Sequence, residues 1–148
     1  MPTPVNYSAN GMPTWKGQAP GLDANGVISN IAYYPRMVAK TASYTVLRTE
    51  SGTVFHTTGA TAAIVFTLPA ISTGPWWFEF FNGADQSMTV TSATADTIVT
   101  YNDLAADNVA FSTSSEKIGG HTIAWTDGTT LFVVAHGASQ AQHITVTS

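Results

Sequence analysis

The sequence of 148 residues contains no cysteine, which excludes disulfide bonds, thiol catalysis and zinc–thiolate sites. Charged residues are also scarce, because they make up 9% of the chain where about a quarter is usual. The five lysines and arginines are spread along the chain, and the formal net charge is −4. A nucleic-acid-binding protein needs a basic patch to neutralise phosphates, so we expect no nucleic-acid partner.

Long apolar runs are missing as well, since none reaches the roughly 18 residues of a membrane span. We therefore expect no membrane partner. The first residues, MPTPVNYSANG, lack the basic region and apolar core of a secretory signal, so we expect assembly in the cytoplasm of the cell that makes the protein. Thr, Ser, Ala and Gly take the place of charged residues. A surface of this kind suits flat packing against a partner, because few ions must be desolvated.

The first 40 residues differ in composition from the rest and predict an extended N-terminal arm. They hold five of the seven prolines, with glycines between them, which disfavours both helices and long strands. Unlike most disordered tails, the segment is rich in aromatic and large aliphatic residues. The candidate anchors are Tyr7, Trp15, Ile28, Ile31, Tyr33 and Tyr34. The arm either wraps its own domain or reaches across a neighbouring subunit, and the sequence leaves both open.

From residue 41 onward the pattern changes to short β-strands. Alternating apolar and polar residues, bounded by turn residues, predict strands over 44–47, 53–56, 62–68, 76–81, 87–92, 97–101, 109–111, 121–126, 131–135 and 144–147. Residues 103–109 are compatible with one turn of helix. About ten strands at roughly ten-residue spacing are typical of a sandwich or barrel. We therefore predict an all-β fold, with one β-sandwich domain of jelly-roll type over residues 41–148 and the arm over residues 1–40.

The strand over residues 76–81 carries bulky apolar side chains on both of its faces. Alternation puts the even-numbered residues from Trp76 to Phe80 on one face, and the odd-numbered residues from Trp77 to Phe81 on the other. Such a strand lies between two layers, or one of its faces meets another chain. The adjacent tryptophans therefore belong to the core, to a subunit interface or to a sugar-binding platform, and at most one of them lines a given face.

A search for catalytic and metal-binding groups yields only weak candidates. The four histidines are not spaced as metal ligands, although His136 and His143 flank a polar loop that a surface metal would fit. A calcium loop through the aspartates of residues 96–107 lacks a glycine-punctuated ligand series. Glu79 is more simply a carboxylate paired with Lys or Arg than one member of a glycosidase pair. No nucleophile elbow or Walker-type loop is present, so we expect no enzyme, no metal and no cofactor.

Three stretches of the sequence follow one another in an order that supports a family resemblance. Residues 40–70 contain KTASYTV, ESGTVF and TGATAAIVFTLPA in succession, with a distinctive Leu-Pro-Ala at the end. The element Asp96-Thr97-Ile98 follows, and then the hairpin sequence DGTTLFV of residues 127–133. Together, over residues 40–135, these stretches resemble a recurrent β module of tailed-bacteriophage structural proteins. Phe132 stands where that module usually has a closing tryptophan.

The resemblance implies a virion structural protein, and a short free-standing chain with an apolar arm is closest to a capsid decoration (cement) protein. Such a protein would bind the major capsid protein on the outer surface of the head as a homo-oligomer, most simply a trimer, and stabilise the shell. The interface residues expected on this basis are Tyr7, Trp15, Ile28, Ile31, Tyr33, Tyr34 and Trp77. The alternative is a tail-fibre or tail-tip module that binds host-surface carbohydrate through Trp76 or Trp77.

Overall fold

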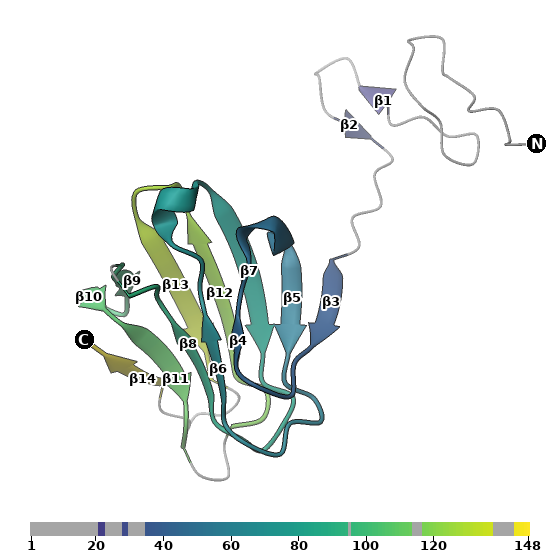
Figure 1. The fold of residues 1–148 in the computed structure, drawn as a ribbon, viewed down its shortest axis with the longest axis vertical. Helices are drawn as coiled ribbons and strands as arrows, with labels where there is room; N and C mark the ends of the chain where they lie inside the picture. The colour runs from purple at the N-terminus through teal and green to yellow at the C-terminus, as the bar shows by residue number, and fades with distance from the viewer. Residues whose placement is uncertain (1–20, 23–27, 30–34, 95, 114–116, 138–143) are drawn as a thin grey trace, which may run out of the picture. The chain divides into compact units, whose positions relative to one another are not determined.

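A computed structural model describes residues 21–22, 28–29, 35–94, 96–113, 117–137 and 144–148 of the chain. The chain divides into two compact units, Met1–Tyr34 and Pro35–Ser148. In the first unit, β1 (Gly21–Leu22) pairs antiparallel with β2 (Ile28–Ser29). The second unit holds all the other strands that the structure describes (Figure 1).

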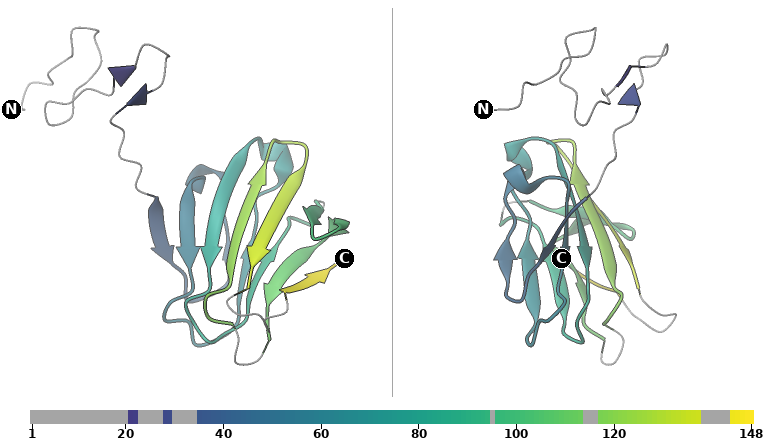
Figure 2. Two further views of the ribbon diagram at one scale, coloured as in Figure 1. Left: turned by 180° about the vertical axis from the view of Figure 1, so that it is seen from behind. Right: turned by 90° about the vertical axis from the view of Figure 1, so that its right-hand side faces the viewer.

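The second unit consists of two mixed β-sheets that pack face to face (Figure 2). The larger sheet has the order β10 (Asp103–Ala106), β9 (Ile98–Thr100), β13 (Leu131–His136), β12 (His121–Thr126), β7 (Trp76–Phe81), β5 (Thr53–His56) and β3 (Arg36–Ala39). The smaller sheet has the order β14 (Ile144–Thr147), β11 (Asn108–Phe111), β8 (Met88–Thr91), β6 (Ile64–Thr67) and β4 (Tyr44–Thr45). Two short 3-10 helices, η1 (Arg48–Glu50) and η2 (Ile71–Thr73), lead into β5 and β7. The prediction of an all-β sandwich is confirmed.

The first six strands of the second unit alternate between the two sheets, so the chain follows a helical path that we call the coil. In the larger sheet β3, β5 and β7 are parallel neighbours, and in the smaller sheet β4, β6 and β8 are parallel neighbours. The chain therefore crosses from one sheet to the other at every step, and each turn of the coil adds one strand to each sheet. A jelly roll is built from antiparallel strands, so this domain is a β-sandwich with mixed sheets.

The strands that follow the coil complete both sheets. β12 and β13 form an antiparallel hairpin that lies between β7 and β9 in the larger sheet. β12 pairs antiparallel with β7, and β13 pairs parallel with β9. β11 and β14 extend the smaller sheet from β8. Through this arrangement the last hairpin occupies the middle of the larger sheet.

Alternation along the strands fills the space between the sheets with aromatic rings. Phe55 of β5, Phe66 of β6, and Phe78 and Phe80 of β7 are fully buried. The ring centroids of Phe66 and Phe80 lie 4.9 Å apart, and that of Phe55 lies 5.8 Å from Phe80. Burial of each such side chain stabilises the fold by about 1.5–3 kcal/mol. The inner face of β7 is thereby fixed, and its odd-numbered residues must point outward.

Two segments have a secondary structure that differs from the one expected from the sequence. Residues 103–109, which were compatible with a helical turn, form β10 and the start of β11. Tyr101 and Asn102 make a turn before β10 with φ of 39° and 65°, and Asp103 Oδ1 then accepts a hydrogen bond from the Ala105 N–H. Arg36–Ala39, which lay within the predicted arm, form β3 beside β5. The second compact unit begins at Pro35 and so includes β3.

A buried asparagine holds the turn that follows β7. Asn82 Oδ1 accepts a hydrogen bond of 2.5 Å from Thr57 Oγ1, and Asn82 Nδ2 donates to the carbonyl oxygens of Gln86 and Lys117 at 2.9 Å each. Thr57 Oγ1 in turn accepts from the Gly83 N–H at 3.0 Å. These bonds join the ends of β5 and β7 to the loop before β12. They fix three of the strands that carry the candidate site.

Candidate interaction face

The larger sheet has an apolar face on the side away from the smaller sheet. The strand registers place its outward side chains in three rows across β5, β7, β12 and β13. The rows are Trp77, Trp125 and Phe132; then Val54, Glu79, Ile123 and Val134; then His56, Phe81, His121 and His136. We call these residues, together with Met37 of β3, the outer face. It is the candidate site.

Large apolar side chains are exposed across the outer face. The exposed fractions are 36% for Trp77, 38% for Trp125, 40% for Val134, 42% for Phe81 and 66% for Met37. Glu79 is the only carboxylate of the outer face, and lysine and arginine are absent from its defining residues. Single exposed apolar residues are normal, but a contiguous patch of this kind marks an interaction site.

The first row forms an aromatic ridge. The rings of Trp125 and Phe132 are nearly parallel, with an interplanar angle of 22° and centroids 5.7 Å apart. Trp77 lies opposite Trp125 on β7, and its backbone N–H donates to Ser51 Oγ at 3.1 Å. At that spacing the rings of Trp125 and Phe132 partly cover each other's faces. The ridge therefore offers ring edges and partial faces to a partner.

The turn between β12 and β13 sets the register of this ridge. Asp127 Oδ1 accepts hydrogen bonds from the backbone N–H groups of Thr129 and Thr130, at 2.8 and 2.9 Å. These bonds, first that from Thr130 and then that from Thr129, lower the pKa of the Asp127 carboxyl because they stabilise its charged form. With the turn closed, Thr126 pairs with Leu131 and points inward. The next cross-strand pair, Trp125 and Phe132, must then point outward.

The third row brings ionisable side chains together. His121 Nε2 lies 2.6 Å from Glu79 Oε1, and the imidazole rings of His121 and His136 stack with centroids 6.1 Å apart. The partner of Glu79 is thus a histidine, and the expectation of a Lys or Arg partner is wrong. Because both groups are partly exposed, the pair contributes little to stability on its own. Its consequence is to hold the carboxylate in place on the outer face.

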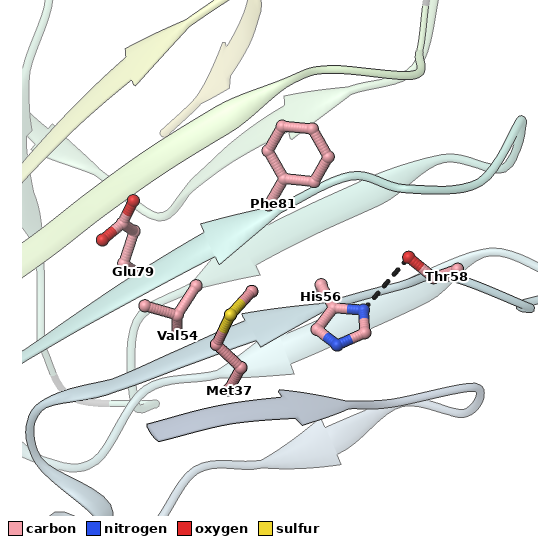
Figure 3. Close-up of a pocket in the computed structure, with 6 residues that line it drawn as sticks. All are labelled: Met37, Val54, His56, Thr58, Glu79 and Phe81. Carbon is pink, nitrogen blue, oxygen red and sulfur yellow. Dashed lines mark hydrogen bonds between the residues drawn. The ribbon is translucent and has the colours of Figure 1, made fainter. Parts of the chain in front are cut away.

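A shallow pocket of about 360 Å³ lies where the outer face crosses β3, β5 and β7 (Figure 3). Its lining residues are Met37, Val54, His56, Thr58, Glu79 and Phe81. Val54 is buried and forms the floor, while Met37 and Phe81 are exposed at the rim. His56 Nδ1 lies 3.1 Å from Thr58 Oγ1, which fixes the orientation of that imidazole. The pocket thus combines apolar walls with one carboxylate.

The interface residues expected from the sequence fall into two groups. Trp77 lies on the outer face, whereas Trp76 is only 4% exposed and belongs to the core. Adjacent tryptophans therefore face opposite ways, as alternation predicts. Ile28 lies in β2 of the first unit. The other expected anchors lie outside the described residues: Tyr7, Trp15, Ile31, Tyr33 and Tyr34.

Trp125 and Phe132 were not among the expected interface residues. The Asp127-Gly128 signal predicts a hairpin here, but a two-residue turn at these positions would place Trp125 opposite Thr130. The observed turn spans residues 127–130 and places Trp125 opposite Phe132. The sequence also does not place either residue beside Trp77, since the pairing of β7 with β12 joins strands 40 residues apart. Only the tertiary structure assembles the ridge.

Neither a metal-binding cluster nor a membrane-spanning helix is found among the described residues. Within the described ranges, no group of three or more His, Asp or Glu side chains could hold a metal ion. Of the two histidines that flank the loop expected to fit a surface metal, His136 ends β13 and His143 lies outside the described residues. No helix in the described part of the chain is long and apolar enough to cross a membrane. Protein-family models, curated proteins and solved structures all gave no match to this chain.

Proposed function

We propose that this chain is a bacteriophage structural protein, a decoration protein that binds the outer surface of a phage head and stabilises it. The observation that carries the proposal is the outer face, where an aromatic ridge and further exposed apolar side chains surround a single carboxylate. The resemblance over residues 40–135 supports the viral context. Low overall charge supports a role in flat protein–protein packing. The partners proposed are the major capsid protein and further copies of this chain.

The energetics of the ridge suit such a role. An exposed fraction of 36% for Trp77 corresponds to roughly 90 Å² of a side chain of about 250 Å². Covering it with a partner is worth about 2 kcal/mol at 25 cal/mol per Å². Trp125, with a similar exposed fraction, contributes about as much. Few charges must be stripped of water in return, and the gain from several such side chains offsets the entropy that association costs.

The location of the protein is tested by electron microscopy of the phage particles, with gold-labelled antibodies raised against the chain. We expect label spread regularly over the heads. Label confined to tails or fibres would replace the decoration role with the tail-fibre role. Particles without label would overturn both, because the protein would then not be a part of the virion.

The role of the outer face is tested by binding of purified variants to heads that lack the protein, measured by co-sedimentation. Trp77→Ala is expected to weaken binding about 30-fold per contact site, which corresponds to 2 kcal/mol. The matched control is Val65→Ala on the opposite sheet, because Val65 is 37% exposed on β6. Equal binding by both variants would show that another surface contacts the capsid.

The alternative, a tail module that binds carbohydrate, is favoured by the neighbouring tryptophans Trp77 and Trp125 on one face. Sugar rings stack on open aromatic faces, and the mutual packing of Trp125 and Phe132 covers part of the surface they would need. We therefore rank this function second. Binding of the purified chain to a glycan array, lost in Trp77→Ala, would favour it. A blank array would leave the decoration role.

A further inference from the structure

We propose that the pocket between β3, β5 and β7 receives a lysine or arginine side chain of the partner protein. The inference rests on the proposed function, since it names a contact within the same outer face. It is argued from the shape of the pocket, from its unbalanced charge and from the positions of the chain's own cations.

The shape of the pocket fits a long side chain with an apolar stem. Val54 closes the floor, and Met37 and Phe81 form flexible and aromatic walls. A volume of about 360 Å³ holds a lysine or arginine side chain with room for water. Long basic side chains commonly bury their methylene groups on such a surface and keep the charged end at its rim.

The negative charge of Glu79 favours the binding of a cation in the pocket. Glu79 Oε1 is occupied by His121, but no described residue hydrogen-bonds Glu79 Oε2. The second oxygen of this carboxylate therefore lies beside apolar walls without a hydrogen-bond partner among the described residues. The exposed ring of Phe81, two residues along β7, adds an aromatic face that attracts cations. A partner cation would satisfy both groups at once.

The cations of the neighbouring edge strand do not supply this contact. Lys40 Nζ lies 3.1 Å from the centroid of the Tyr44 ring, and Tyr44 packs against the core between the sheets. Arg36 pairs with the buried Thr53, so alternation directs its side chain to the side of β3 away from the outer face. Both cations thus point away from the outer face, and the pocket is left for a cation from outside.

The pocket is tested on the isolated full-length chain by NMR titration with blocked amino acids. The probes are N-acetyl-lysine methylamide and its neutral counterpart of similar size, N-acetyl-norleucine methylamide. We expect the lysine probe to shift the backbone amide signals of Val54, His56 and Phe81, and to bind at least tenfold more tightly than the norleucine probe. In Glu79→Gln the affinity for lysine should fall at least tenfold, because the amide keeps the shape but loses the charge.

Asp85→Asn is the matched control, because Asp85 is an exposed acid in the turn after β7 and lies outside the pocket lining. It should bind lysine as the parent does. Equal binding of both probes, an unchanged Glu79→Gln variant or an absence of shifts would each overturn the proposal. None of these results bears on the location of the protein in the virion, and a failed immunogold experiment would leave the pocket result intact.

Discussion

At the scale of single residues, the outer face depends on polar side chains that are themselves outside it. Asn82 ties the end of β7 to the strands on either side, and its position next to Phe81 sets where the pocket wall ends. Asp127 closes the turn that brings Trp125 opposite Phe132. An apolar interaction surface is thus aligned by hydrogen bonds at its margins.

Replacing Asn82 with alanine is expected to destabilise the fold by about 2–4 kcal/mol, because the buried Thr57 hydroxyl and two part-buried carbonyl groups lose their hydrogen-bond partner. Differential scanning calorimetry should show a melting temperature lower by roughly 10 °C. Gln86→Ala is the control, since only its backbone carbonyl bonds to Asn82. A loss below about 0.5 kcal/mol in Asn82→Ala would contradict the role assigned to it.

Asp127 makes the stability of the second unit depend on pH. Its pKa is lowered in the folded state by the Thr130 and Thr129 N–H groups, so its contribution is complete above the unfolded pKa near 4. The contribution is lost as pH falls through the lower folded value. Denaturant unfolding of the parent and Asp127→Asn should therefore differ equally at pH 7 and pH 5, and should converge toward pH 2. A stability difference between the two proteins that grows on acidification would mean that folding raises, and does not lower, the pKa of Asp127.

At the scale of elements, the sequence predicted the strands well but not their partners. The strands at residues 53–56, 76–81 and 121–126 have the predicted bounds, because alternation and turn residues are local signals. Trp77 could be placed on the face opposite Phe78 for the same reason. The parallel coil could not be predicted, since each of its pairings joins strands in different turns. The outer face is a product of those pairings.

The edge position of β3 gives a prediction for that element. Lys40 N–H donates to the His56 carbonyl, so alternation directs the Val38 N–H toward β5 and the Met37 N–H away from it. Proline at position 38 removes a ladder hydrogen bond, whereas proline at position 37 removes none. Val38→Pro is therefore expected to be less stable than Met37→Pro by at least about 1 kcal/mol.

Urea unfolding of the two proline variants measures this difference, and amide hydrogen exchange of β5 locates it. Faster exchange in β5 of Val38→Pro alone would agree with an open outer edge on β3. Equal losses in both variants would mean that the outward edge of β3 is also hydrogen-bonded in the protein.

At the scale of the whole molecule, the two units have separate parts in the proposed function. Pro35–Ser148 contains its own aromatic core and both sheets. Met1–Tyr34 carries the apolar anchors expected from the sequence. We propose that the second unit presents the outer face and that the first unit anchors the protein to its partner.

A chain that begins at Pro35 is expected to fold, with a melting temperature within a few degrees of the parent, but to bind phage heads much more weakly. Circular dichroism and co-sedimentation test the two halves of this prediction. Unfolding of the shortened chain would place the first unit in the core. Full binding by a folded shortened chain would show that the outer face suffices.

The position of the β12–β13 hairpin also has a consequence for synthesis of the protein. The ribosome releases β7 and β9 long before residues 121–136, which must be inserted between them. Until then the nascent sheet has two unpaired edges beside the aromatic side chains of β7, and such edges invite association with other chains. A chain that stops after Thr113 is therefore expected in the insoluble fraction to a greater extent than the complete chain, which sedimentation of cell lysates would measure. Completion of the β12–β13 hairpin would then limit the yield of folded protein.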